Sequence, residues 1–137
     1  MSEDGGAFSA YLIGTYEKRL NIFTVLHIIN PTTEELRVVI AFYDDKEEYQ
    51  TCLKRVLTPN DLEEINVLED VKELGPKFGV VKIISYKDDK PVHGIVGFQR
   101  HAVVVPGTAL GFTESVLASV PTELAEKELE IILEKCP

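Results

Sequence analysis

The sequence predicts a mainly β fold: an antiparallel, immunoglobulin-like β-sandwich of about seven strands with a C-terminal α-helix. Three observations favour this class. Runs rich in Val, Ile, Phe and Tyr recur at roughly ten-residue spacing, turn residues bound each run, and the last fifteen residues carry apolar side chains at helical spacing. A chain of 137 residues with a hydrophobic fraction of 45% is long enough for one domain with its own core.

The chain divides into four segments on this interpretation. Residues 1–7 are small, acidic and glycine-rich, and we expect them to be disordered. Residues 8–105 are predicted to form the sandwich domain, and residues 106–121, with Gly107 and Gly111, a loop. Residues 122–136 are predicted to form a helix that packs on the same domain or on a neighbouring subunit.

The centre of the predicted sheet is a hairpin of two apolar runs, Ile22–Ile29 and Leu36–Tyr43. Each run has about eight residues, a strand length, and both are rich in residues that suit a pleated surface. Pro31 lies between them and prevents a helix from continuing through this segment. The remaining predicted strands are Phe8–Tyr16 as an edge strand, Tyr49–Leu57 near a sheet edge, Phe78–Tyr86 and Val92–Val105.

Residues 62–74 fit either a strand or a helix, because apolar residues recur at helical spacing while the first six residues also suit a strand. A short strand followed by one helical turn that ends before Gly75-Pro76 is favoured. The tail has a clearer pattern. Thr122 is the candidate N-cap, Lys135 suits the C-terminal end, and one apolar face contains Ala125, Leu129, Ile132, Leu133 and Cys136.

Composition argues against several partners and locations. The formal net charge is −9 and positive residues occur at most in pairs, so nucleic acid is not expected as a partner. No apolar run approaches the length of about 18 residues that spans a bilayer, so no membrane insertion is expected. Since the first residues also lack the pattern of a signal peptide, we expect a cytoplasmic protein. In that compartment Cys52 and Cys136 are expected to be free thiols.

A catalytic or metal site is not predicted, and neither is a cofactor. His27, His93 and His101 would need to converge with a carboxylate or thiolate to bind a metal ion, and no ligand spacing in the sequence indicates that. Cys52 and Cys136 have no neighbouring signature of a nucleophilic cysteine. The glycines of residues 94–97 and 107–111 do not match a phosphate-binding loop, so bulges and turns explain them better.

The preferred binding patch is the polar cluster Gln99, Arg100 and His101, with His93 in the same strand phase as Gln99 and His101. Arg100 interrupts an otherwise apolar run, and a half-buried arginine requires a carboxylate partner. Such a residue would anchor a small acidic ligand or another protein. The alternative is that Arg100 is an edge-strand charge that faces water.

Five short motifs carry a resemblance to a known family. They are Asn30-Pro31, Phe42-Tyr43-Asp44, Leu57-Thr58-Pro59, Pro91-Val92 and Gln99-Arg100. In this order the chain resembles the soluble transducer of sensory rhodopsin and related microbial β-sandwich proteins, over residues 22 to about 100. The resemblance implies a compact, non-enzymatic sandwich that forms a homo-oligomer and acts by binding partners. The acidic helical tail departs from the family's pattern.

Self-association is also predicted from the pattern of the strands themselves. A strand with one face on the core and one in water should alternate apolar and polar residues. Residues 22–29, 36–43 and 78–86 instead carry apolar residues in both phases, so one sheet is apolar on both faces. The C-terminal helix covers part of the outer face in the competing explanation. The leading hypothesis is therefore a non-catalytic binding module that acts as a homo-oligomer; the alternatives are a small histidine- or metal-dependent enzyme and a structural subunit of a larger assembly.

Overall fold

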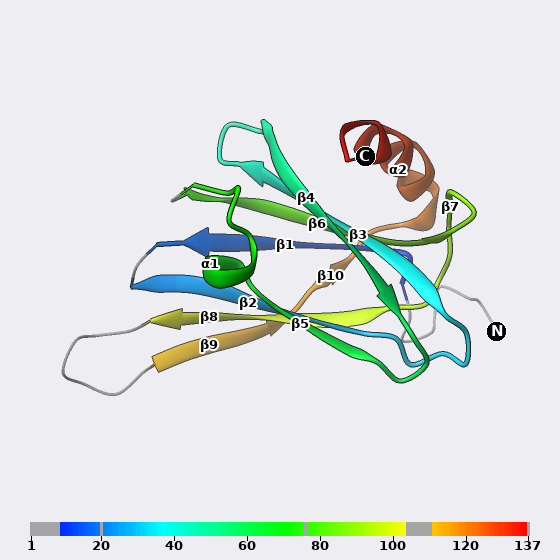
Figure 1. Cartoon of the computed structure of the whole chain (residues 1–137), viewed down its shortest axis with the longest axis horizontal. Coiled ribbons are helices and arrows are strands. Elements are labelled where there is room, and N and C mark those ends of the chain that lie inside the picture. The colour runs from blue at the N-terminus through cyan, green and yellow to red at the C-terminus, as the bar shows by residue number, and fades with distance from the viewer. Residues whose placement is uncertain (1–8, 20, 76, 104–110, 137) are drawn as a thin grey trace.

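A computed structural model describes residues 9–19, 21–75, 77–103 and 111–136 (Figure 1). It confirms a mainly antiparallel β fold with a C-terminal helix. The predicted disorder of residues 1–7 falls outside the described residues. The elements are β1 Tyr11–Lys18, β2 Ile22–Ile29, β3 Leu36–Asp44, β4 Tyr49–Leu57, β5 Leu62–Asn66, α1 Val67–Asp70, β6 Lys77–Lys87, β7 Lys90–Pro91, β8 Val96–Val103, β9 Gly111–Val116, β10 Ala118–Ser119 and α2 Thr122–Lys135.

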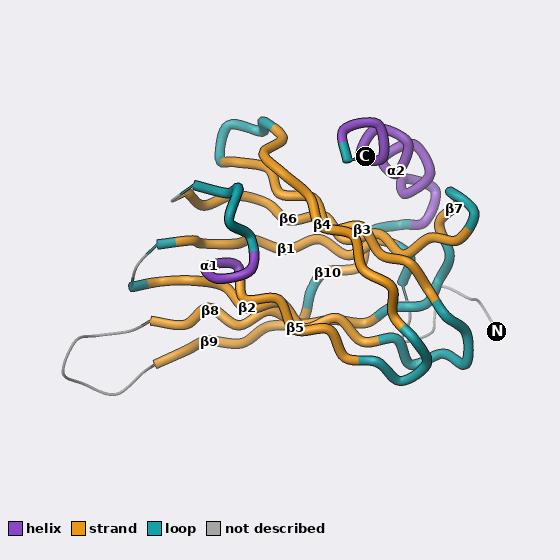
Figure 2. Tube along the Cα trace, in the orientation of Figure 1, coloured by secondary structure: helices purple, strands orange, loops and turns teal. Residues whose placement is uncertain are grey.

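All ten strands belong to one sheet, in the order β4-β3-β6-β1-β2-β8-β9, while β10 pairs with β1, β5 with β2 and β7 with β6. Among the described residues β1 and β2 are paired at a single position, Lys18 with Phe23. Beyond that position they diverge, and β2 pairs with β5 and β8 while β1 pairs with β6 and β10. The sheet therefore has two halves, β4-β3-β6-β1 and β5-β2-β8-β9, which Figure 2 shows meeting at the β1–β2 hairpin.

The main core lies between these two halves. Leu26 and Ile28 of β2 and Ile65 of β5 pack with Ile40 of β3 and Ile83 of β6, and all five are 0–1% exposed. Because alternate residues of a strand point to opposite faces, one phase of each strand supplies this core. Burial of such aliphatic side chains contributes about 1.5–3 kcal/mol each.

A second apolar layer covers the outer face of the half β4-β3-β6-β1. Val39 and Ala41 of β3 and Ile84 of β6, which point to this face, are each 0% exposed and pack in one cluster with Leu129 and Ile132 of α2. In Figure 1, α2 lies over the end of this half, beside β7. The helix thus covers part of the second face of these strands, as the competing explanation for their two-sided apolar pattern predicts.

The two cysteines are paired, which corrects the expectation of free thiols. Cys52 of β4 and Cys136, directly after α2, form a disulfide with their Cα atoms 5.9 Å apart. The apolar face of α2 positions this bond, because Cys136 is 2% exposed in the cluster beneath the helix. The disulfide joins positions separated by 84 residues in the sequence and attaches the end of α2 to the sheet.

Several boundaries differ from the prediction. The sheet has ten strands instead of about seven, and the three that the sequence pattern does not predict are β7, β9 and β10. The predicted loop 106–121 contains β9 and β10; its residues 106–110 lie outside the described residues. The first strand is not an edge strand, since β1 pairs with β6 along its whole length and also with β10. Pro121, not Thr122, occupies the N-cap position of α2.

Other local predictions are confirmed. Residues 62–74 form a short strand followed by one helical turn, and Asn66 caps that turn by accepting hydrogen bonds from the main-chain N–H groups of Leu68 and Glu69. The strand Tyr49–Leu57 lies at one edge of the sheet. In the part of the chain that the structure describes, neither helix has the length and hydropathy to cross a membrane.

Candidate functional site

The predicted patch does not form a single site, because its residues alternate along β8. Gln99 points towards β1, where its Oε1 accepts the Thr15 N–H at 3.1 Å, and its Nε2 donates to Ser115 Oγ at 3.2 Å. A Cβ at Gly14 would lie 2.4 Å from Gln99 Oε1, so a glycine there leaves room for the amide. Gln99 therefore links β1, β8 and β9 and has a structural role.

His101 points in the same direction as Gln99 but has different partners. Its Nδ1 lies 2.9 Å from Oγ1 of Thr24, a residue of β2 that is 0% exposed. Thr24 Oγ1 also accepts the Glu17 N–H at 2.8 Å. The imidazole thus belongs to a hydrogen-bond network that holds β8, β2 and β1 together near the point where the two halves of the sheet meet.

Arg100 points to the opposite face of β8. Its Nη2 and Nε donate to Glu114 Oε2 at 2.9 and 3.2 Å, and its guanidinium carbon lies 4.6 Å from the centre of the Phe112 ring. The carboxylate that the sequence required is therefore supplied by β9 of the same chain. Because the guanidinium group is already paired with Glu114, Arg100 is less suited to bind an acidic ligand than to contribute to a polar contact surface.

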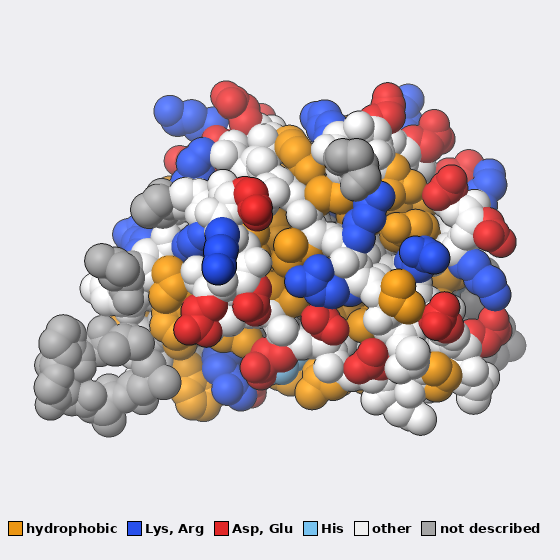
Figure 3. All heavy atoms as spheres, in the orientation of Figure 1, with side chains coloured by type: hydrophobic (Ala, Val, Ile, Leu, Met, Phe, Trp, Pro, Cys, Tyr) orange, Lys and Arg blue, Asp and Glu red, His pale blue; other side chains and the backbone are white. Residues whose placement is uncertain are grey.

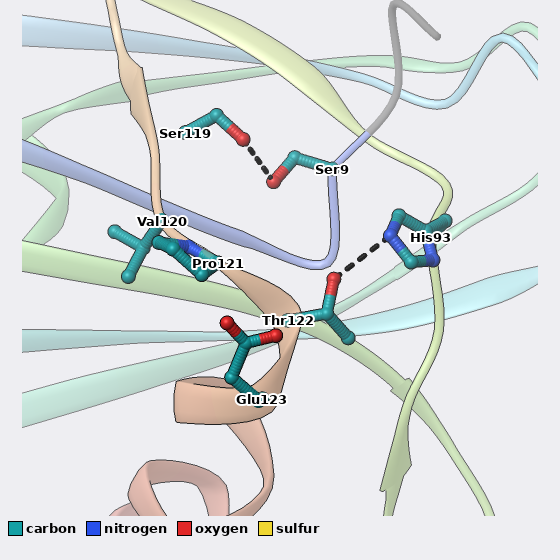
Figure 4. Close-up of a pocket in the computed structure, with 7 residues that line it drawn as sticks. All are labelled: Ser9, His93, Ser119, Val120, Pro121, Thr122 and Glu123. Carbon is teal, nitrogen blue, oxygen red and sulfur yellow. Dashed lines mark hydrogen bonds between the residues drawn. The ribbon is translucent and has the colours of Figure 1, made fainter. Parts of the chain in front are cut away.

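His93 lies between β7 and β8 at a hollow of about 370 Å³ (Figure 4). Its Nε2 lies 2.8 Å from Thr122 Oγ1 at the start of α2, and Ser9 Oγ lies 2.8 Å from Ser119 Oγ across the same hollow. Glu123, near the start of α2, also lines the hollow. The contact between His93 and Thr122 joins the start of α2 to the segment between β7 and β8. His93 therefore lies apart from Arg100, which faces β9.

His27, on β2, completes the set of histidines. Its Nε2 lies 2.9 Å from Glu64 Oε2, its ring stacks on Phe98 at 4.6 Å, and its Nδ1 is buried without a hydrogen-bond partner among the described residues. The three histidines thus have separate partners on separate elements. Within the described ranges, no three His, Cys, Asp or Glu side chains are grouped so that they could hold a metal ion.

Two buried polar groups belong to the main core. Lys18 Nζ donates to the main-chain carbonyls of Val71 and Leu74, at the end of α1, and its burial lowers the pKa of the amine. Burial also raises the pKa of the Tyr16 phenol to about 12, with a further contribution from the negative charge of Asp44. Lys18 thus fixes the segment that follows α1 to β1, so its role is structural.

A different surface emerges from the strand register. The outward side chains of the half β5-β2-β8-β9 form four rows across the strands, and we call this surface the open face. Its members are Phe23, Ala102 and Phe112; Asn66, Val25, Arg100 and Glu114; Glu64, His27, Phe98 and Val116; and Leu62, Ile29 and Val96. Nine of these fourteen side chains are Ala, Val, Leu, Ile or Phe, which is unusual for the water-facing side of an antiparallel sheet.

No described helix or strand covers the open face, since α2 packs on β3 and β7 and α1 contributes to the main core. Leu62, Phe112 and Val116 are 53%, 55% and 81% exposed. The open face carries one arginine and two glutamates, a net charge of −1 in a chain of −9. On the side of the molecule shown in Figure 3, by contrast, charged side chains of both signs are scattered over most elements.

The sequence carried a signal for this surface that the patch prediction did not use. Phe23, Val25 and Ile29 are the second apolar phase of the run 22–29. That phase predicts self-association, whereas the predicted binding patch consists of polar residues of the neighbouring strand. The open face combines both, because Arg100 lies in the same row as Val25.

Comparisons with known proteins leave function open. No protein-family model matches the chain, and no curated protein matches it either. Among solved structures, the fold is similar to the crystal structure of Thermotoga maritima 1070, with a TM-score of 0.62 and 12% sequence identity over 82% of this chain and 95% of that chain. At this identity the similarity concerns the fold alone.

Proposed function

We propose that this protein is a non-catalytic protein-interaction module that acts as a homo-oligomer, with the open face as its contact surface. One observation carries the proposal: α2 packs on the apolar outer face of one half of the sheet, whereas the apolar outer face of the other half has no described cover. Exposed apolar surfaces of this kind mark protein–protein contacts.

A second copy of the chain is the occupant that the charges favour. Two chains of net charge −9 repel each other over most approaches. The open face carries only −1 of that charge, so the repulsion between two such faces is weak. Two sheets that pack face to face lie about 10 Å apart with interdigitated side chains, which suits rows of Phe, Val, Ile and Leu. A symmetric dimer, in which the same face serves both copies, is the simplest arrangement.

A matched pair of substitutions tests the proposal. Leu62→Glu places a carboxylate on the open face, and Leu124→Glu does the same on the exposed side of α2, where the leucine is 56% exposed against 53% for Leu62. We expect Leu62→Glu to lower the molar mass measured by light scattering, and Leu124→Glu to leave it unchanged. Equal masses for both variants and the wild type would reject the open face as the contact, and a wild type of 15.3 kDa at every concentration would reject self-association.

Three further assignments belong to this proposal. An immunoglobulin-like sandwich is supported by the single core between the two halves of the sheet. Kinship with the sensory rhodopsin transducer family is supported by the turn motifs, and it agrees with a binding role. A cytoplasmic location is the third assignment, whereas the Cys52–Cys136 bond is more typical of oxidising compartments. Thiol counting on protein purified from its native compartment distinguishes the two.

A further inference from the structure

The free edge of β9 is a second feature that points to a partner. Among the described strands β9 pairs with β8 and with no other, so it is the last strand of its half. All six of its residues are exposed. Natural edge strands are commonly protected by lysine, proline or a bulge. The segment Gly111–Val116 has none of these, and Glu114 is its one charged residue.

The hydrogen bonds of β9 show which main-chain groups are free. Leu117, directly after β9, donates its N–H to the Gly97 carbonyl at 3.0 Å, in the same register that pairs Ser115 with Gln99. Because the main-chain groups of successive residues point alternately to the two sides of an antiparallel strand, Ser115 and Thr113 also direct theirs to β8. Phe112, Glu114 and Val116 therefore direct their N–H and C=O groups away from β8, to the free edge.

We propose that two copies of the chain pair antiparallel through this edge, β9 against β9, around a two-fold axis at Glu114. This inference rests on the proposed self-association and adds a second contact to it. In this register Phe112 of each copy lies opposite Val116 of the other, and Glu114 lies opposite its own counterpart. All three free-edge residues of each copy then form pairs that exchange two hydrogen bonds, six in total.

The charges of the central row agree with this register. Two glutamates directly opposite each other destabilise a strand pair. Here each Glu114 carboxylate is already held by Arg100 of its own chain at 2.9 Å. The row across the two copies reads Arg100, Glu114, Glu114, Arg100, with a net charge of zero, and an apolar Phe–Val pair lies on each side of it. A shift by two residues, with Phe112 opposite Glu114, pairs fewer free-edge residues and sets each carboxylate against a phenyl ring.

Cysteine substitutions test the register directly. The axis at Glu114 places Thr113 of one copy opposite Ser115 of the other in a non-hydrogen-bonded pair, with Cα atoms about 4.5 Å apart, which a disulfide can bridge. A mixture of the Thr113→Cys and Ser115→Cys variants should therefore give a covalent dimer under mild oxidation, and either variant alone should not. No dimer in the mixture, or an equal yield from Thr113→Cys alone, would overturn the proposed register.

Main-chain hydrogen bonding is tested by Val116→Pro against Val116→Ala. Both replace the valine side chain, which is 81% exposed, but only proline also removes a free-edge N–H, and it does so without breaking a bond to β8. Two hydrogen bonds are lost per dimer, so the dissociation constant of the edge contact should rise about tenfold or more over that of Val116→Ala. Equal constants would overturn the inference.

The two contacts fail separately. If Leu62→Glu lowers the mass while Val116→Pro behaves as Val116→Ala, the edge pairing is wrong and the open-face contact stands. If Val116→Pro lowers the mass and Leu62→Glu does not, the open-face contact is wrong and the edge pairing stands. A wild-type chain that stays at 15.3 kDa rejects both.

Discussion

Removal of the Cys52–Cys136 disulfide should lower the free energy of unfolding by up to about 4.5 kcal/mol, because the bond closes a sequence separation of 84 residues in the unfolded chain. That figure follows from loop-closure entropy alone, and disulfides commonly contribute about 2–4 kcal/mol. The native state retains the apolar contacts of Ala125, Leu129 and Ile132 beneath α2, so the fold should survive reduction with a lower stability.

The assay is urea unfolding followed by circular dichroism, on wild-type protein with and without reductant and on the double variant Cys52→Ala with Cys136→Ala. We expect the transition of reduced wild type and of the double variant to shift to lower urea by similar amounts, and the double variant to be insensitive to reductant. Coincident transitions of oxidised and reduced wild type would refute the reasoning. So would two reactive thiols per chain in unreduced, unfolded protein.

Two further predictions concern the core. Leu129→Ala, at a side chain 1% exposed between α2 and the sheet, should cost about 2–5 kcal/mol in urea unfolding, whereas Leu124→Ala, at 56% exposure, should cost less than about 0.5 kcal/mol. Because the folded state raises the pKa of Tyr16 from 10.0 to about 12, it favours the neutral phenol; stability should therefore fall as the pH rises from 10 to 12. Tyr16→Phe should lessen that fall. If the free energy of unfolding of this variant, measured by urea unfolding between pH 10 and 12, fell as steeply as that of the wild type, Tyr16 would not be the responsible group.

Much of the fold could be predicted from local pattern. The runs 22–29, 36–43, 49–57 and 78–86 match strands closely, because their composition and length leave little choice between strand and helix. The strand β9 escaped prediction because the segment GFTESV has neither alternation nor a strong apolar run. It forms a strand by pairing with β8, which is a tertiary effect that no local pattern reveals. The disulfide escaped for the same reason, since its two ends meet through the packing of α2.

The candidate site was harder to predict, and the reason is the period of a strand. Gln99, Arg100 and His101 are consecutive in sequence, and successive side chains of a strand point to opposite faces of the sheet. The three residues therefore do not form one cluster. Gln99 hydrogen-bonds to β1 and His101 to β2, so both stabilise the contacts between strands. Arg100 pairs with Glu114 on β9, a strand that the sequence pattern does not predict. The prediction places His93 in the same strand phase as Gln99 and His101. Because β8 begins at Val96, His93 lies outside the strand and does not share that phase.

The two halves of the sheet differ in what covers their second apolar face. Val39, Ala41 and Ile84, in the second phase of β3 and β6, are 0% exposed under α2, so this part of the two strands does not require a partner chain. In β2 the second phase faces the open side, where α2 does not reach. The helix is attached at its far end to β4, the edge farthest from β9, so it cannot serve both halves. Self-association therefore involves one face and one edge that lie side by side on the same strands, and it does not require that the whole sheet be apolar on both faces.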